Sequence, residues 1–409
     1  MRIVHVTHRA WPVVGGSEQY VQEVARRQVL DQHQVTVVAT DAEDLSALWS
    51  GKGRRVSADA PRAHQGVRIE RLPVHYLPWG AVTAPALRRA TWLLSAMSGY
   101  AALPLARFSP WIPRLPQTLA ETPADLLIAW NLTLEGLTAA VAREAARRQT
   151  PWVAMPLLHL GRGQFYTMRH QLELLRAARA VLAQTPLERA FLLERGIPAA
   201  RVHLVSPGVD PEGGARADGQ RFRHKHAIDG PLVVTMGALC YDKGTHHLLA
   251  AARRFWEAGR PLTVALVGPR QEGVQRALAR LGPRERSMCR AMGLIPEAEK
   301  WDAVAAADVV ALPSRTESFG IVFLEGWLCG KPVIGARSGA VPDVIDAGRD
   351  GLLVDFGDVG GLAAALAALI DDPNRAAEMG HHGREKVLER YTWDVQYARL
   401  RGVIDASLP

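Results

Sequence analysis

The sequence has no long apolar run and few cysteines. No stretch of about eighteen apolar residues occurs in the 409-residue chain, which argues against a membrane-spanning helix. The only cysteines, Cys240, Cys289 and Cys329, lie far apart and lack the spacing of metal ligands. A small, uneven number of cysteines is typical of proteins in a reducing compartment, and we therefore expect a cytoplasmic protein.

Three common site motifs are also missing. No Gly-x-Gly-x-x-Gly follows the first expected strand, which argues against a nicotinamide enzyme. Residues 237–243 lack the Gly-Lys-Ser/Thr ending of a Walker A loop. No Asp-x-Asp metal motif stands out in a loop that follows a strand.

The length and the apolar pattern predict two domains built alike. A single core rarely extends over 409 residues. Short apolar strands alternate with helical patterns in both halves, and this alternation is typical of parallel sheets with helices on their faces. The expected strands are 3–6, 35–39, 125–129, 152–155, 232–237, 262–268, 309–313, 332–335 and 351–354, and the expected helices include 18–30, 134–148 and 246–255. We predict a hinge over the Gly/Pro/Arg-rich residues 207–230.

Positive charge is concentrated in the first half of the chain. Residues 1–185 hold 21 Lys and Arg against 13 Asp and Glu, whereas the remainder is balanced. This excess favours an anionic contact such as a membrane surface, a lipid phosphate or an acidic glycan, with an ordinary solvated surface as the alternative. The segment 77–116 is rich in Pro, Trp, Leu and Arg. It predicts a helical insertion packed on its own domain, and peripheral membrane contact is the alternative.

Residues 313–326 contain two carboxylates next to an expected helix start. A strand ends at Pro313, a polar loop carries Glu317, and a helix begins near Phe319 with Glu325 about two turns along it. Free amides at a helix start favour a phosphate, and carboxylates accept hydrogen bonds from sugar hydroxyls. The pattern therefore suits a ligand that has a sugar, a diphosphate and a ribose.

This segment resembles the Glu-x7-Glu signature of family-4 retaining glycosyltransferases of the GT-B fold. The likeness continues through 330–334, 339–343 and 351–354. It implies that Glu317 contacts the donor sugar, that Glu325 holds the ribose hydroxyls, and that the intervening residues bind the donor. Those intervening residues are Ser318, Phe319, Gly320 and Ile321.

Three other segments extend the resemblance. Gly15 and Gly16 resemble the family's N-terminal glycine loop over the donor phosphates, where a missing Cβ permits close approach. His159 resembles a histidine placed beside the donor sugar, with an ordinary loop or core histidine as the alternative. Lys243 matches the lysine of a phosphate-binding Arg-x4-Lys segment, but Ala238 stands where the family usually has arginine. Arg270 and Arg315 are candidates to replace the missing cation.

We therefore predict an α/β, GT-B protein with two Rossmann-like doubly wound domains that face across a cleft. Residues 1–205, completed by a C-terminal helix of about 386–409, are expected to bind a glycan, lipid-linked or small-molecule acceptor. Residues 206–385 are expected to bind a nucleotide-diphosphate sugar. Glu317, Lys243 and His159 are the expected catalytic residues, and the resemblance implies retention by front-face attack without a metal cofactor. We expect no nucleic-acid partner. A sugar-nucleotide-binding pseudoenzyme, an epimerase and a phosphorylase remain alternatives.

Overall fold

The computed structural model describes residues 1–77, 80–160 and 168–408 of the chain, which form two compact units. Unit 1 runs to Leu158, continues up to Val205 and takes in the C-terminal residues from Tyr397. Unit 2 contains Ser206–Gln396 together with His159 and Leu160. The predicted α/β fold with two parallel-sheet domains is confirmed.

Unit 1 is built on an eight-stranded sheet in the order β3-β4-β2-β1-β5-β6-β7-β8. Every described neighbouring pair is parallel except β3 with β4. The central strands are buried along almost their whole length, as expected for a parallel sheet that is covered on both faces. The strands are β1 (Arg2–Val6), β2 (Gln34–Thr40), β3 (Ala63–His64), β4 (Val67–Leu72), β5 (Leu126–Trp130), β6 (Trp152–Met155), β7 (Ala180–Ala183) and β8 (Val202–Leu204).

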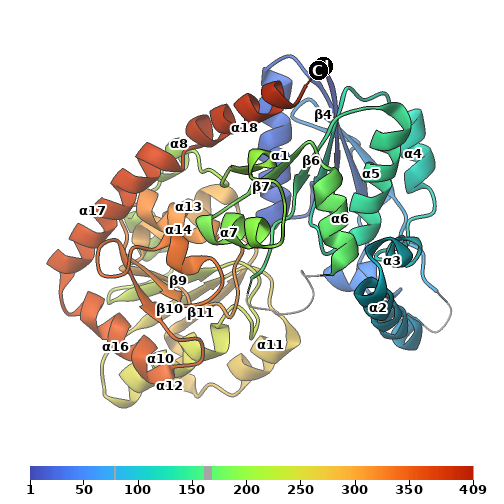
Figure 1. Ribbon diagram of the computed structural model, residues 1–409. Helices are drawn as coiled ribbons and strands as arrows, with labels where there is room; N and C mark the ends of the chain where they lie inside the picture. Colours follow the sequence, from blue (N-terminus) through green and yellow to red (C-terminus); the bar gives the residue numbers. More distant parts are fainter. Residues whose placement is uncertain (78–79, 161–167, 409) are drawn as a thin grey trace. The chain divides into compact units, whose positions relative to one another are not determined.

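Helices cover both faces of this sheet. In Figure 1, α1 lies on one side of the strands and α5 and α6 lie on the other. The helical segments are α1 (Gly16–Leu30), η1 (Leu45–Leu48), α2 (Gly80–Met97), α3 (Gly99–Ala106), α4 (Leu115–Glu121), α5 (Glu135–Arg148), α6 (Arg169–Ala177), α7 (Pro186–Glu194) and η3 (Ala199–Arg201).

The basic segment 77–116 forms α2 and α3, although its residues 78–79 lie outside the described part. One side of α2 packs on its own unit, since Thr91 and Ser95 are buried and the Ser95 hydroxyl lies 3.1 Å from Nδ1 of His170 on α6. This agrees with the predicted insertion. Its other side exposes the apolar side chains of Trp92, Leu93 and Met97. None of the helices in the described part of the chain combines the length and the apolar character that crossing a bilayer requires.

Unit 2 contains a six-stranded parallel sheet in the order β11-β10-β9-β12-β13-β14. Alternate strand residues supply two separate cores. Val234 and Val310 join the core under α9, α13 and α14, whereas Val233 and Val309 join the core under α10 and α16. Figure 1 shows these two layers of helices on opposite sides of the strands. The strands are β9 (Leu232–Met236), β10 (Thr263–Val267), β11 (Cys289–Gly293), β12 (Val309–Leu312), β13 (Val333–Ala336) and β14 (Gly351–Val354).

The helices of unit 2 include two in the segment that we expected to be a hinge. Residues 207–230 form α8 and α9, and α9 is capped by the Asp218 carboxylate, which accepts a hydrogen bond from the Arg221 amide. Arg221 also pairs with Asp302 of α13 at 2.6 Å, so this segment is part of the folded unit. The helices are α8 (Pro211–Ala215), α9 (Gly219–Lys225), α10 (Thr245–Glu257), α11 (Glu272–Ala279), α12 (Pro283–Ser287), α13 (Glu297–Ala306), α14 (Ile321–Leu328), α15 (Val341–Val344), α16 (Val359–Ile370) and α17 (Pro373–Arg390).

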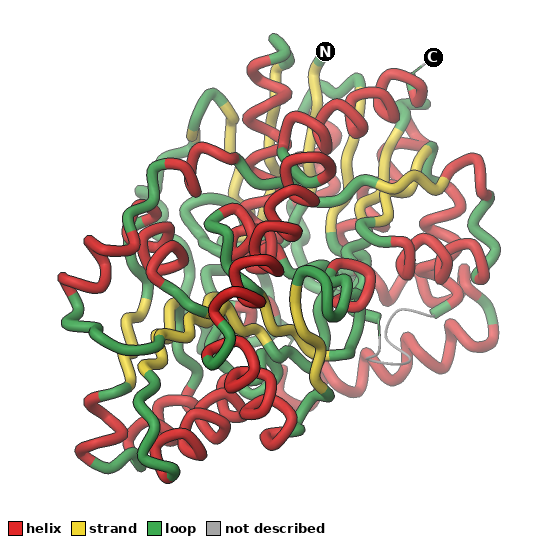
Figure 2. Tube along the Cα trace, turned by 90° about the vertical axis from the view of Figure 1, so that its left-hand side faces the viewer, coloured by secondary structure: helices red, strands yellow, loops and turns green. Residues whose placement is uncertain are grey.

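The expected C-terminal helix is two helices. α17 ends at Arg390, and α18 (Trp393–Ser407) follows after two residues and carries the chain from unit 2 into unit 1. In Figure 2 the strands of each unit lie side by side as yellow tubes, with red helices around them.

Candidate active site

The loops after the central strands of unit 2 approach each other closely. Gly268, which follows β10, has a φ of +129°, and a Cβ there would lie 2.0 Å from the carbonyl oxygen of Gly237 after β9. Only glycine fits such a contact without moving the backbone. The carboxyl ends of β9 and β10 are thereby held together at the edge of the sheet where doubly wound domains bind ligands.

Lys243 and Glu317 meet at this edge. Lys243 comes from the loop after β9 and Glu317 from the loop after β12, and their Nζ and Oε1 atoms are 2.5 Å apart. The approach of the two loops depends on Gly244, whose φ is +74° and whose Cβ would lie 2.2 Å from the carbonyl oxygen of Pro313. The half-buried Lys243 and the buried Glu317, 74 positions apart in sequence, thus form one ion pair.

The Glu317 carboxylate is kept ionised despite its burial. Burial raises the pKa of Glu317, but the charge and hydrogen bond of Lys243 and the nearby His159 lower it further, so the pKa lies below its ordinary value. His159 belongs to unit 2 with Leu160, whose carbonyl oxygen accepts a hydrogen bond of 3.3 Å from the Thr316 hydroxyl. The next residues, 161–167, lie outside the described part. The structure therefore brings the three expected catalytic residues together.

The start of α14 is shaped by Gly320. This residue is the N-cap with a φ of +95°, and a Cβ would lie 2.5 Å from the ring of Phe323. The helix begins at Ile321, two residues later than we expected, because Phe319 instead buries its ring against Tyr391 at a centroid distance of 5.5 Å. No side chain caps α14, and within its first turn the Phe323 amide donates a hydrogen bond of 3.0 Å to the Gly320 carbonyl oxygen. Ser318 is half-buried in the preceding loop.

Glu325, on α14, has a lysine partner of its own. Nζ of Lys300 lies 2.8 Å from Oε1 of Glu325 and 2.6 Å from Oε1 of Glu297. Burial lowers the pKa of Lys300, but the two carboxylates raise it further, so the pKa lies above its ordinary value. Lys300 was not predicted as a site residue, because its place beside Glu325 depends on how α13 packs on α14.

Ala238 is exposed in the loop after β9, and both suggested substitutes lie near that loop. Arg270 pairs through its backbone with Leu239, and its side chain is exposed. Arg315 is engaged by Asp242, with its Nε 3.2 Å from Oδ1. The exposed Arg270 guanidinium is therefore better suited to contact a bound anion, since Arg315 is already paired with Asp242.

In unit 1, Gly15 and Gly16 begin α1 beside a buried carboxylate. Gly15 is the N-cap, and a Cβ there would lie 2.2 Å from Oε2 of Glu18. Glu18 is almost fully buried, and its Oε1 lies 2.8 Å from the Arg9 guanidinium and 3.1 Å from Nε2 of His8. Nothing crowds the Cβ position of Gly16. Glu18 therefore leaves no room for a side chain at Gly15, whereas the Cβ position of Gly16 is open.

Charge pairing keeps Glu18 ionised. Burial raises the pKa of Glu18, but the hydrogen bond and charge of His8 and the charge of Arg9 bring it down to about 2. The Asn131 side-chain amide lies 3.0 Å from Nδ1 of His8 and so helps to orient the imidazole whose Nε2 lies against Glu18. Asn131 follows β5, and its pairing with a residue after β1 was not predictable before the strand order was known.

Comparisons with known proteins agree with this geometry. A family model described as "Glycosyl transferases group 1" matches residues 217–386, and one described as "Glycosyl transferase 4-like domain" matches residues 15–208. The chain belongs to the family-4 glycosyltransferases of the GT-B fold. The predicted family is thereby confirmed.

Some glycosyltransferase relatives match about half of this chain, and others match nearly all of it. The chain is 36% identical over 218 residues to a GDP-mannose-dependent alpha-(1-6)-phosphatidylinositol monomannoside mannosyltransferase of Mycolicibacterium smegmatis. That match covers 50% of this chain and 56% of the relative, so the chain spans little more than half of the relative's length. A Mycobacterium tuberculosis protein of the same description is 29% identical over 419 residues, which covers 98% of this chain and 97% of that protein.

A solved structure confirms the GT-B fold. The structure of Anabaena HepE in complex with UDP matches with a TM-score of 0.73 and 20% identity, and the match covers 99% of this chain and 100% of HepE. At this identity the likeness concerns the fold alone. The roles of the individual site residues in this glycosyltransferase stay predictions.

Proposed function

We propose that this protein transfers a sugar from a nucleotide-diphosphate sugar to an acceptor, with retention of the anomeric configuration. The observation that carries the proposal is the ion pair of the half-buried Lys243 with the buried Glu317, which lies beside His159 and close in sequence to the start of α14. A carboxylate held ionised can accept hydrogen bonds from sugar hydroxyls, while a lysine and the free amides of a helix start stabilise a diphosphate.

In the proposed reaction, the bond between the anomeric carbon and the diphosphate oxygen breaks as the acceptor oxygen attacks from the same face. The acceptor proton passes to the departing diphosphate, so no enzyme nucleophile is needed. Lys243 stabilises the negative charge that grows on the leaving group. Glu317 orients the sugar, Glu325 holds the ribose, and Ser318, Phe319, Gly320 and Ile321 line the donor site.

Names of relatives suggest the first substrates to test. Two relatives are described as GDP-mannose-dependent enzymes that act on a phosphatidylinositol monomannoside. We propose a GDP- or UDP-sugar as donor and a glycan or lipid-linked acceptor. We further propose peripheral contact with the inner face of a membrane, in the cytoplasm, and the exposed apolar side of α2, with Trp92, Leu93 and Met97, supports contact with a membrane.

The proposed reaction requires no metal. Lysine side chains and helix amides supply the positive potential that Mg²⁺ supplies elsewhere. This part of the proposal is tested by transfer rates with and without EDTA. A loss of activity on chelation, restored by Mg²⁺, would contradict it.

Ala238 favours one second candidate, a protein that binds a sugar nucleotide without transferring the sugar. The missing arginine removes one positive charge from the loop after β9, and leaving-group stabilisation depends on such charges. Restoring it by Ala238→Arg should speed a transferase but leave a binding protein inactive.

The deciding experiment is a thermal-shift and hydrolysis panel with GDP-, UDP- and ADP-sugars. A true donor at a hundred times its dissociation constant should add about 2.7 kcal/mol of stability. Transfer with NMR detection of the product then shows whether the anomeric configuration is retained. Binding without release of sugar, even after acceptors are supplied, would favour the second candidate. No shift with any nucleotide sugar would contradict both.

A further inference from the structure

Unit 1 contains a cavity of about 470 Å³ that the proposed donor chemistry does not use. This volume lies within the range of roughly 300–1,000 Å³ that is typical of small-molecule sites. Most of its wall is apolar or aromatic. Its lining residues with large apolar side chains are Leu48, Trp49, Tyr76, Leu77, Leu87, Leu105, Phe108 and Trp111.

The cavity lies where three strands end. Leu48 and Trp49 follow β2, Tyr76 follows β4, and Glu135 begins α5 after β5. β2 and β5 both flank β1, whose end leads to Gly15 and Gly16. Since the carboxyl ends of parallel strands meet at one edge, the cavity opens on the same edge as the glycine loop. The insertion α2–α3 closes it with Leu87 and Leu105.

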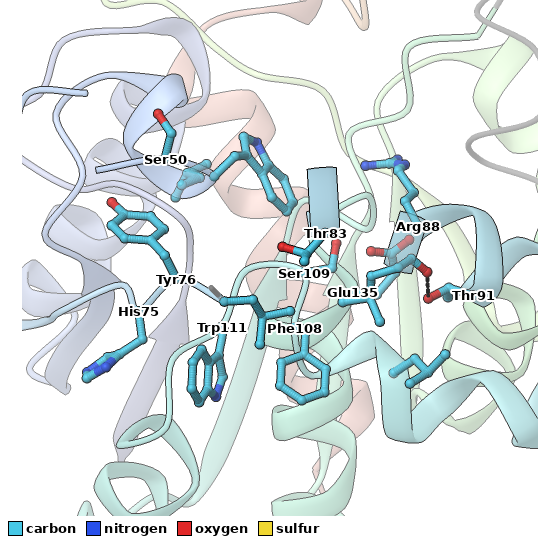
Figure 3. Close-up of a pocket in the computed structure, with 15 residues that line it drawn as sticks. Ser50, His75, Tyr76, Thr83, Arg88, Thr91, Phe108, Ser109, Trp111 and Glu135 are labelled. Carbon is cyan, nitrogen blue, oxygen red and sulfur yellow. Dashed lines mark hydrogen bonds between the residues drawn. The ribbon is translucent and has the colours of Figure 1, made fainter. Parts of the chain in front are cut away.

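One end of the cavity is polar and prearranged. In Figure 3, Arg88, Thr91 and Glu135 gather on one side, opposite Tyr76 and His75. Glu135 is only 2% exposed, and its Oε1 accepts a hydrogen bond of 3.0 Å from Nε2 of Gln171. A buried carboxylate fixed in this way can accept a further hydrogen bond from a ligand hydroxyl.

The aromatic end is held rigid by ring contacts. Trp111 packs edge-on against Phe108 and against His75, with both centroid distances at 5.7 Å. The cavity therefore combines a fixed apolar wall with one hydrogen-bonding end. An apolar body is favoured along the aromatic wall because burial of each methylene is favourable, whereas Arg88 and Glu135 give the opposite end its charged groups.

We propose that this cavity is the acceptor subsite and that it holds the apolar chain or ring system of a hydroxyl-bearing amphiphile, with a hydroxyl at Glu135. The inference rests on the proposed transferase function and names the class of its acceptor. The same chemistry is offered by a membrane lipid and by a free hydrophobic glycoside. α2 suits an acceptor from either source, because Leu87 lines the cavity whereas Leu93 is exposed on the outer side of the same helix.

The test uses n-alkyl maltosides of increasing chain length, below their micelle concentrations, with binding followed by calorimetry on the full chain. Affinity should rise about fourfold per added methylene, as expected for burial of a CH₂ group. Leu87→Asp should weaken binding at least tenfold, whereas Leu93→Asp, on the outer face of the same helix, should bind as the wild type does. Leu87→Ala is a milder variant if the aspartate prevents folding. Affinity independent of chain length, or equal in Leu87→Asp, Leu87→Ala and wild type, would overturn the proposal.

Two further measurements distinguish a membrane acceptor from a free one, and a failure of the proposed subsite from a failure of the proposed transferase function. If the acceptor comes from a membrane, wild-type protein floats with phosphatidylinositol-containing phosphatidylcholine vesicles and Leu93→Asp does not. If the acceptor is free, neither floats and alkyl maltosides still bind; both results support the subsite. A wild type that binds alkyl maltosides but turns over no nucleotide sugar would contradict the transferase function alone.

Discussion

At the residue scale, the proposed donor site consists of carboxylates that each have a lysine. Glu317 is paired with Lys243, and Glu325 with Lys300. A lysine beside a buried carboxylate offsets the cost of burying its charge and fixes its orientation. The two pairs differ in one respect: in the proposed reaction Lys243 also contacts the leaving diphosphate, whereas Lys300 lies between two carboxylates.

Replacing Lys243 should therefore damage turnover more than stability. In Lys243→Ala we expect the rate of sugar transfer to fall by about 10²–10³-fold, the usual effect of removing one group that stabilises growing negative charge. Steady-state kinetics with the donor found by the panel checks this. Arg253→Ala, which breaks an exposed pair with Glu285 on the same unit, is the control and should keep wild-type rates. Equal rates in both variants would remove Lys243 from the mechanism.

The buried Glu18 predicts a pH-dependent effect on stability. Its pKa of about 2 lies below the value in an unfolded chain, so its contribution is present above pH 4.5 and is lost as the pH falls toward 2. Glu18→Gln should cost about 3 kcal/mol of unfolding free energy at pH 7, and less at pH 3.5. Urea unfolding of both proteins at the two pH values measures the difference. A cost that does not change with pH would show that Glu18 is not ionised in the folded protein.

At the scale of elements, the loops depend on glycines at which a Cβ has no room. Gly320 caps α14 with a positive φ, and a Cβ would press on Phe323. Gly320→Ala should therefore lower the unfolding free energy by about 1–3 kcal/mol and weaken donor binding, because the helix start would move. Gly402→Ala, in α18 and with open space around its Cβ position, should be neutral or stabilise by up to about 1 kcal/mol. Thermal unfolding and donor titration compare the two, and an unaffected Gly320→Ala would contradict the argument.

The sequence predicted individual strands and helices better than the contacts between them. The buried strands 232–236 and 309–312 were predictable, because apolar runs of this length between loops are typical of parallel sheets. β4 was missed because charged residues interrupt it, as in Arg68 and Glu70. The helices in 207–230 were missed because glycine and proline normally mark loops, whereas here Pro211 begins α8. The pair of Glu325 with Lys300 joins α14 to α13, and the pair of Glu18 with His8 joins α1 to the loop after β1, so both depend on how the elements pack and no local pattern signals them.

At the scale of the whole molecule, unit 1 is completed by the end of the chain. The Tyr397 hydroxyl donates a hydrogen bond of 2.7 Å to Asp31 at the end of α1, and Leu400 and Ile404 are buried. Burial of two such side chains contributes roughly 3–6 kcal/mol. α18 is therefore structural for unit 1, although the residues directly before it belong to unit 2.

Truncation after Gln396 should destabilise unit 1 selectively. We expect calorimetry to show its unfolding transition at lower temperature, while unit 2, which ends at Gln396, unfolds as before. Removing only residues 408–409 is the control and should leave both transitions in place. Two transitions unchanged after the larger truncation would show that α18 adds nothing to unit 1.

This arrangement has a consequence for synthesis on the ribosome. Residues up to Val205 emerge well before those from Tyr397, which complete the same unit. Unit 2 can finish folding once Gln396 has emerged, but unit 1 must wait, with the binding place of α18 uncovered, until the rest of α18 has emerged. A nascent chain stalled before α18 would thus expose apolar surface of unit 1, and a chaperone would still meet this early-made part after unit 2 has folded.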